Sequence, residues 1–198
     1  MYNLSTSGHN EPVALKEWAV VVRALASGEQ IFLLRKGGIV EETRDFQLLS
    51  PTFYLMETYE HQKAELLKEP ARPVLEETLQ DWQQNASQMR LSLYGEVTEE
   101  LEIRDQETLD KLYPYHIWTE ELAEKRLKWK RKQPLHLLFI RAWRLKEPAE
   151  VPVREPYLGC KSWVRLEDGV PESTFEEVLS QQAYESRCRE IRQVLGQS

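Results

Sequence analysis

The sequence contains little of what disulfide-linked, zinc-binding and membrane proteins require. Its two cysteines, Cys160 and Cys188, stand far apart, and no secretory signal is recognisable at the amino terminus. The apolar runs are far shorter than the roughly 20 residues that cross a bilayer. We therefore expect a cytoplasmic protein with free thiols, no disulfide framework and no contact with a membrane.

Signature motifs of catalysis are also scarce. Restriction-type nucleases need a carboxylate and a lysine two positions apart on one strand, but no Asp-x-Lys or Glu-x-Lys triplet occurs. The pair Gly37-Gly38 lacks the spacing and the following Lys-Ser/Thr of a phosphate-binding loop. The histidines and cysteines are scattered, whereas zinc ligands come in close pairs. The sequence predicts no metal site and no cofactor.

The composition indicates one folded domain. The chain has 198 residues, of which 41% are hydrophobic, enough to bury one substantial core. The formal net charge of −7 works against indiscriminate binding of polyanions, although a local basic groove is compatible with it. Residues 1–11 are polar and predict a disordered tail, and residues 12–198 a single domain.

Hydrophobic periodicity predicts an α+β domain in which helices cover a small mixed or barrel-like β-sheet. The predicted strands are 31–35, 53–55, 91–97, 101–104, 135–145 and 157–166. The predicted helices are 12–26, 59–68 with Thr58 as its cap, 74–84, a short one capped by Asp105, 120–132 and 173–195. The prolines at 148, 152 and 156 predict an irregular connection between the last two strands.

One of these elements has an alternative. The β-branched residues from Val20 to Val22 also favour a strand. In that interpretation 19–25 and 30–35 form a hairpin around Ser27-Gly28-Glu29.

The carboxy-terminal segment predicts a long amphipathic helix. Ser173 and Glu176 have the spacing of a capping box at its start. Its apolar stripe consists of Phe175, Val178, Leu179, Ala183, Cys188, Ile191 and Leu195. The stripe could cover the core of its own domain, or residues 173–195 could form a homodimer interface.

Two short clusters are candidates for chemistry. Arg35 and Lys36 end an apolar strand just before a glycine pair that lets a ligand approach the backbone, so they are candidates for anion recognition. Tyr59, His61 and Gln62 are further ligand-binding candidates. His61 is the most suitable titratable group, although an ordinary surface histidine is the competing interpretation.

A third cluster is basic and aromatic. Residues 125–132 hold six cations and one tryptophan, which suits contact with phosphates and stacking on a base. Cations are also favourable at the carboxy-terminal end of a helix without any ligand. The candidate ligand-binding residues in this cluster and near residue 160 are Lys128, Trp129, Lys130, Arg131, Lys161 and Trp163.

Four segments carry a resemblance to a known family. They are Leu15-Lys16-Glu17-Trp18-Ala19, residues 33–39, residues 58–62 and residues 159–164. Over residues 14–166 the chain resembles an uncharacterised bacterial domain-of-unknown-function family. Some members of that family are fused to, or occur beside, restriction-endonuclease-like modules. The resemblance therefore implies a role in DNA or RNA transactions.

A shorter stretch is similar to the ASCH group of PUA-like barrels. Trp18-Ala19 and the run from Gly28 to Arg35 keep the glycine-to-arginine spacing of that group's signature. Gln30 and Leu33 replace the lysine and the glutamate of the signature, and the interval from tryptophan to glycine is longer. This similarity implies a barrel that binds RNA or nucleotides.

Three functions follow from these patterns. The leading hypothesis is a non-catalytic module, linked to restriction or RNA metabolism, that recognises nucleic acid or a nucleotide through Arg35, Lys36 and residues 125–132. The second is a phosphoester or nucleotide hydrolase with Glu41, Glu60 and His61 as acid/base or metal-binding groups. The third is a scaffold whose carboxy-terminal helix binds another protein chain. Whether the chain is an enzyme stays open.

Overall fold

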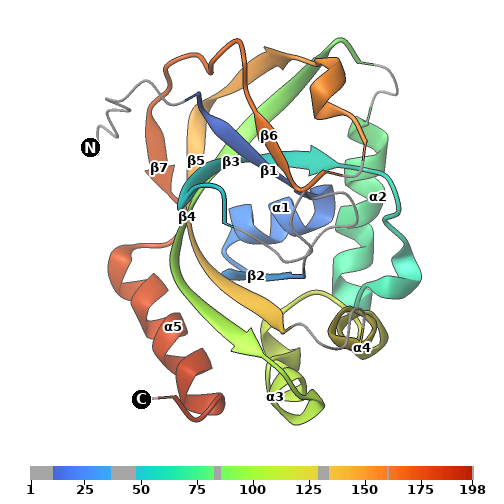
Figure 1. The fold of residues 1–198 in the computed structure, drawn as a ribbon, viewed down its shortest axis with the longest axis vertical. Coiled ribbons are helices and arrows are strands. Elements are labelled where there is room, and N and C mark those ends of the chain that lie inside the picture. Colours follow the sequence, from blue (N-terminus) through green and yellow to red (C-terminus); the bar gives the residue numbers. More distant parts are fainter. Residues whose placement is uncertain (1–10, 37–47, 83–85, 129–133, 160, 198) are drawn as a thin grey trace.

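A mixed β-sheet organises the part of the chain that the computed structural model describes, residues 11–36, 48–82, 86–128, 134–159 and 161–197 (Figure 1). The strands described there are β1 (Val13–Trp18), β2 (Phe32–Arg35), β3 (Thr52–Thr58), β4 (Gln88–Ile103), β5 (Leu135–Pro152), β6 (Trp163–Arg165) and β7 (Phe175–Glu177). The strand order is β2-β5-β4-β3-β1-β6, and β7 pairs with β5. The β1–β3 pair is parallel and the other pairs are antiparallel. The predicted α+β class with a mixed sheet in one domain is confirmed, and the sheet is not closed.

Two long strands give the sheet its shape. The antiparallel pairing of β4 with β5 shifts register between Leu91 and Leu93 and again between Val97 and Glu99. Such irregularities bend a strand and increase its twist. The edge of β5 that faces away from β4 pairs with β2 in its first half and with β7 further along.

Helices lie around this sheet. Those of the described residues are α1 (Ala19–Ser27), α2 (Arg72–Asp81), α3 (Gln106–Lys111), α4 (Glu120–Lys128) and α5 (Gln181–Val194). In Figure 1, α1 lies in the middle of the view between β1 and β2, α2 and α4 lie on one side of it, and α5 lies on the other. Asp105 caps α3 as predicted, because its side chain accepts a hydrogen bond from the Thr108 N–H at 2.8 Å.

The segment 12–26 differs from the prediction. Only its second half is helical, and Val13–Trp18 forms β1 between β3 and β6. Val13, Ala14 and Leu15 are buried in succession, as expected for a strand covered on both faces. The alternative hairpin is wrong as well, because Gly28 ends α1 in the left-handed conformation, with φ 74°.

The segment after β3 is also different. The predicted helix 59–68 is absent, and two short 3₁₀ helices, Ala64–Leu66 and Glu69–Ala71, stand at 64–71 instead. Thr58 does not cap a helix, because its hydroxyl donates to the Glu17 carbonyl at 3.1 Å and so ties the end of β3 to the end of β1.

Two strands of the sheet are longer than predicted. The strands predicted at 91–97 and 101–104 are parts of one strand, β4. Strand β5 continues through Pro148 to Pro152, where an irregular connection was expected. Pro148 lies between Arg144 and Ala149, where the pairing with β4 is interrupted. A proline there removes no hydrogen bond from the β4–β5 ladder.

The carboxy-terminal helix begins later than predicted. Ser180 is its cap and accepts from the Ala183 N–H at 3.2 Å, whereas the proposed capping-box residue Glu176 lies in β7. Cys188 and Ile191 of the predicted stripe are buried, at 3% and 0% exposure. The stripe of α5 therefore covers the core of its own domain, and the homodimer remains a prediction.

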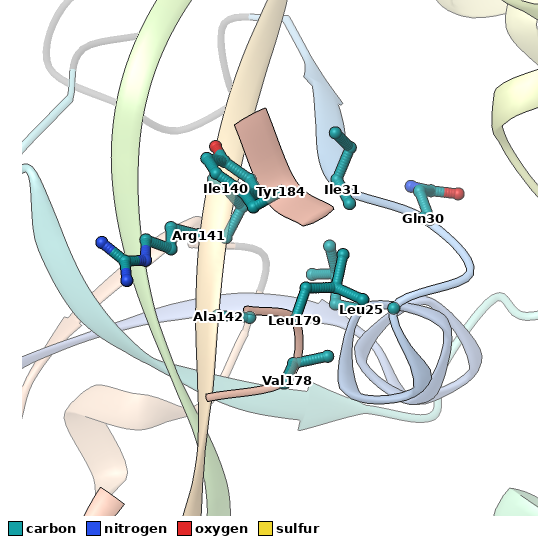
Figure 2. Close-up of a pocket in the computed structure, with 10 residues that line it drawn as sticks. Leu25, Gln30, Ile31, Ile140, Arg141, Ala142, Val178, Leu179 and Tyr184 are labelled. Carbon is teal, nitrogen blue, oxygen red and sulfur yellow. The ribbon is translucent and has the colours of Figure 1, made fainter. Parts of the chain in front are cut away.

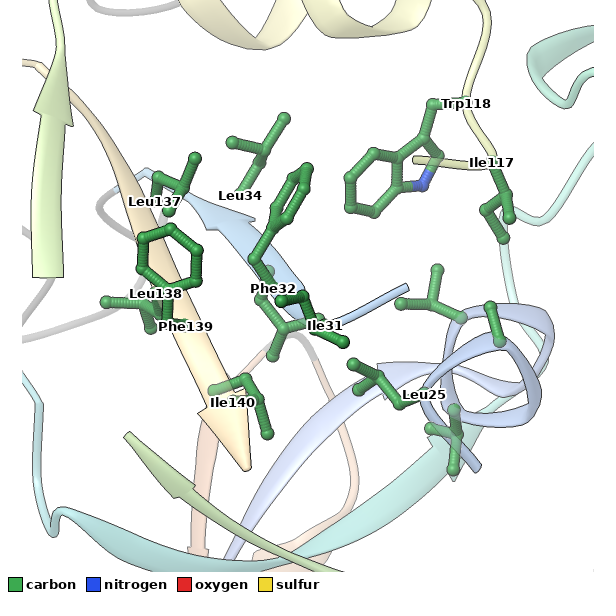
Figure 3. Packing of buried hydrophobic residues seen from close by; sticks show 14 of the residues in the cluster. Leu25, Ile31, Phe32, Leu34, Ile117, Trp118, Leu137, Leu138, Phe139 and Ile140 are labelled. Carbon is green, nitrogen blue, oxygen red and sulfur yellow. The ribbon is translucent and has the colours of Figure 1, made fainter. Parts of the chain in front are cut away.

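Two apolar clusters fill the interior. The larger one, here called the helix-side core, gathers side chains of α1, β2, β5 and the segment before α4, with Leu25, Phe32, Trp118 and Phe139 among them (Figure 3). The smaller one, the aromatic core, packs Tyr94 against Tyr54, Trp143 and Phe175, with ring centroids 5.2, 6.3 and 5.3 Å away. The helix-side core contains the boundary between β1 and α1, where Trp18 is followed by Ala19. This boundary is here called the junction.

Candidate functional site at the β1–α1 junction

The start of α1 is held by two side chains from outside the helix. The Glu17 carboxylate accepts from the Trp18 N–H at 2.9 Å, and the Gln62 side-chain oxygen accepts from the Val20 N–H at 3.1 Å. The first N–H groups of a helix have no partner within it, and together they make its start electropositive. Gln62, one of the predicted ligand-binding residues, therefore positions this end of α1. Its side-chain nitrogen is buried and has no hydrogen-bond partner among the described residues.

Arg35 forms a buried ion pair at the same place. One guanidinium nitrogen lies 3.0 Å from the Glu17 carboxylate and 3.3 Å from the Lys16 carbonyl oxygen. The side chains of Arg35 and Glu17 are 14% and 3% exposed. The prediction that Arg35 belongs to an anion site stays open, because in the structure this guanidinium joins β2 to β1.

Arg126 of α4 brings a second guanidinium to the junction. It donates to the Leu34 carbonyl oxygen at 3.1 Å, and the centre of its guanidinium lies 4.8 Å from the Trp118 ring and 5.6 Å from the Trp18 ring. Among the residues that the structure describes, no carboxylate forms an ion pair with it. A guanidinium carries five N–H donors, so most of them are not used by this one hydrogen bond.

Electrostatics at Arg126 reflect this arrangement. Burial lowers its pKa, the nearby Glu17 carboxylate opposes that shift, and the Arg35 guanidinium adds to it. A cation that is removed from water without a bonded acid gains from the arrival of an anion. An anionic group beside Arg126 would therefore be electrostatically favourable.

Two of the other predicted cations, Lys36 and Lys128, have bonding partners of their own. Lys36 is 8% exposed and donates to the Leu127 carbonyl, and burial lowers its pKa. Lys128 pairs with Glu124 on the exposed side of α4. Lys161 is exposed, and its ammonium lies 3.4 Å from the Pro156 carbonyl oxygen.

The aromatic and acidic candidates are also dispersed. Trp163 is half-buried with its ring edge-on to Phe53, at 5.2 Å between centroids. Glu60 and His61 are exposed in the turn after β3, where His61 has the left-handed φ of 65°. Four further candidates, Glu41, Trp129, Lys130 and Arg131, lie outside the described residues.

A small cavity exists elsewhere. It lies between the end of α1, β5 and the segment before α5, with Leu25, Ile140 and Leu179 on its walls (Figure 2). Its volume of about 10 Å³ suffices for about one water molecule. It is therefore no site for an organic ligand.

Two further structural features concern metal binding and membrane insertion. Within the described ranges, no three histidine, cysteine, aspartate or glutamate side chains are grouped so that they could hold a metal ion. No helix among these residues is both long and apolar enough to cross a membrane.

Sequence reasoning missed the central residues of the junction. The basic pattern at 125–132 contains Arg126 but does not distinguish it from its neighbours, and Glu17 belongs to one of the segments that carry the family resemblance. An available signal is the position of Glu17, a single acid that, together with Lys16, separates the apolar runs 13–15 and 18–22. A buried acid requires a partner, and Arg35 is that partner.

The fold and the junction define a single-domain mixed α/β protein with charged side chains buried at a strand–helix boundary. The chain belongs to the family described as Domain of unknown function (DUF1802), which it matches over residues 14–190. No match was found among curated proteins or among solved structures. The expected membership of a domain-of-unknown-function family is thus confirmed, while the links to restriction-endonuclease-like modules and to ASCH barrels remain predictions.

Proposed function

We propose that the chain is a non-catalytic recognition module for a phosphate-bearing ligand, either a nucleotide or a nucleic acid, and that a phosphate of this ligand binds Arg126 at the start of α1. The observation that carries this proposal is the Arg126 guanidinium, which is partly buried, has one hydrogen bond to a carbonyl oxygen and has no ion-paired carboxylate among the described residues.

Phosphate suits this position for two reasons. Its oxygens accept two parallel hydrogen bonds from a guanidinium, and such charge-assisted bonds are about twice as strong as neutral ones. The positive end of the α1 dipole lies next to it, and helix starts favour anions. The Glu17 carboxylate does not occupy the place, since its two oxygens are bonded to the Trp18 N–H and to Arg35.

Binding would depend on contacts close to Arg126 and not on the overall charge of the molecule. The net charge of −7 gives the whole molecule the wrong long-range field for a polyanion. The cations of Arg154 and Lys125 are paired with Asp168 and Glu121 on the surface. Affinity must therefore come from a few contacts near Arg126. The family resemblance noted above favours nucleic acid as the ligand.

The two other hypotheses receive no comparable support. Glu60 and His61 are exposed in the turn after β3, and no observation on the described residues favours a hydrolase. Cys188 and Ile191 of the apolar stripe of α5 are buried in the domain itself. The hypothesis of a scaffold that binds another chain through this stripe therefore lacks these two apolar residues as a contact surface.

A charge-matched pair of variants tests the proposal. Arg126→Gln and Lys111→Gln each remove one positive charge from neighbouring helices, but Lys111 lies in α3 and pairs with Glu107 at the surface. We expect Arg126→Gln to weaken binding of a fluorescein-labelled single-stranded hexanucleotide about tenfold or more, since a hydrogen bond to a charged group contributes about 1.5–3 kcal/mol. Lys111→Gln should leave the affinity unchanged.

Salt dependence gives an independent measurement on the same samples. Removal of one phosphate contact should reduce the slope of log affinity against log salt by about 0.7 for a single strand. Equal affinity and slope for wild type and Arg126→Gln would refute the proposal, as would equal losses in the two variants.

A further inference from the structure

An exposed aromatic stack is linked to the junction through the turn after β3. The rings of Tyr59 and Trp82 are nearly parallel, with an angle of 16° and 5.8 Å between their centroids. Trp82 remains 40% exposed although Tyr59 covers one face of its ring, and Leu79, three residues earlier, is also 40% exposed. Large apolar side chains with this exposure are few in the described residues, and two of the four belong to this end of α2.

Hydrogen bonds connect the stack to the start of α1. Tyr59 directly follows Thr58, whose hydroxyl bonds the Glu17 carbonyl at 3.1 Å. The Tyr59 hydroxyl donates to the Glu57 carboxylate at 2.7 Å, and Gln62 in the same turn bonds the Val20 N–H. The ring of Tyr59 is thus fixed by its neighbours, so that Trp82 rests on a rigid support.

We propose that Trp82, supported by Tyr59, stacks on a nucleobase, and that the ligand of the junction is therefore single-stranded nucleic acid. This inference rests on the proposed function, because the phosphates of the same strand would reach Arg126. An aromatic face beside a cationic group is the combination that binds single strands, because every base has a π-face and every nucleotide a phosphate. A duplex keeps its bases stacked on one another and offers none to Trp82.

The test compares a strand that carries bases with an abasic strand of the same charge. Wild-type full-length protein is titrated by fluorescence anisotropy with a labelled uridylate hexamer and with an abasic ribose-phosphate hexamer of equal charge. We expect wild type to bind the uridylate hexamer about tenfold more tightly, as stacking on one aromatic ring implies. Wild-type protein that binds both hexamers equally would overturn the inference without any variant.

Variants then assign the preference to Trp82. Trp82→Ala should bind both hexamers with the affinity that wild type has for the abasic one, and Trp82→Phe should keep most of the preference. Leu79→Ala, which removes equally exposed apolar surface from the same helix, should keep all of it. A full preference in Trp82→Ala would overturn the inference.

The failure of the inference and that of the proposed function have different signatures. Arg126→Gln should weaken both hexamers by the same factor and leave the base preference intact. If Arg126→Gln binds as wild type does while Trp82→Ala loses the preference, the phosphate site is wrong and the stacking site stands. If the reverse holds, the phosphate site stands alone.

Discussion

The helix-side core and the aromatic core solve the burial of polar groups in different ways. The buried polar and charged residues of the described chain are Glu17, Gln30, Lys36, Thr78 and His116. Each bonds or contacts members of the helix-side core or its margin, as when Gln30 bridges the Phe32 carbonyl and the Ile117 N–H at 2.7 and 3.1 Å. The aromatic core has its charges outside, as in the Arg154–Asp168 pair at its rim.

This difference bears on the free energy of unfolding of the two regions. A buried polar group contributes little net stabilisation when it is bonded and costs about 1–3 kcal/mol when it is not. The buried charged and amide side chains of the described residues lie outside the aromatic core, whose buried polar groups are tyrosine hydroxyls such as that of Tyr157, which accepts from the Glu167 N–H at 2.9 Å. Two of these polar residues, Glu17 and Lys36, bond to groups at or next to the junction for which we propose ligand binding, where charge and hydrogen-bond donors have a use.

The largest expected effect on stability distinguishes the buried Glu17–Arg35 ion pair from the exposed Arg154–Asp168 ion pair. Glu17→Leu should lower the free energy of unfolding by about 3–5 kcal/mol, because it leaves the Arg35 guanidinium buried without this carboxylate. Asp168→Leu should have an effect close to the scatter of urea denaturation, since its pair with Arg154 is exposed to water.

A double variant sharpens this result. Glu17→Leu/Arg35→Met removes both charges and should recover most of the loss, because apolar residues of similar size can replace a buried pair. If Glu17→Leu is no more damaging than Asp168→Leu, the distinction between the two regions is wrong.

The second prediction uses the pH dependence of the helix-side core. His116 is 5% exposed and lies among Phe32, Tyr113 and Trp118. Burial first, and then the nearby charges of Lys68 and Arg126, lower its pKa from 6.5 to about 3. The folded state therefore holds the neutral imidazole, and the unfolded state takes up a proton below pH 6.5. The stability is fully present above that pH and is lost as the pH falls toward 3.

Urea denaturation between pH 7 and pH 5 measures this loss. Wild type should lose about 2 kcal/mol over this range from His116 alone, since each unit of pH below 6.5 costs about 1.4 kcal/mol. His116→Gln and His116→Phe should both reduce the slope, whatever their stability at pH 7. An unchanged slope in both variants would show that His116 is not the group responsible.

The sequence predicted the elements whose signal is local. The apolar run before Arg35, the run from Leu135 and the cap at Asp105 each carry their cause within a few residues, and each is found. Val13–Trp18 was mistaken for helix because its apolar residues fit both periods. Pairing with β3 and β6 decides its conformation, and these partners are distant in the sequence.

The junction was harder to predict for the same reason. Arg35 was selected because it stands at the end of an apolar strand, but its carboxylate partner comes from β1 and the second guanidinium from α4. A pattern within one segment contains no information on which segments meet. The sequence pattern favours His61 as the titratable group, whereas the histidine with the large pKa shift is His116, whose burial depends on the packing of Phe32 and Trp118.

The smallest predicted effect concerns the start of α5, which covers the helix-side core, and the segment before β7, which borders the aromatic core. The Ser180 hydroxyl accepts from the Ala183 N–H at 3.2 Å, whereas the Ser173 hydroxyl donates to the Glu147 carbonyl at 3.0 Å on an exposed loop. Ser180→Ala should lower the free energy of unfolding by about 1 kcal/mol, because the first turn of α5 then loses its side-chain cap. Ser173→Ala should cost less, since water can replace its exposed partner. A larger loss from Ser173→Ala than from Ser180→Ala in the same denaturation experiment would contradict the assignment of the stabilising cap to Ser180.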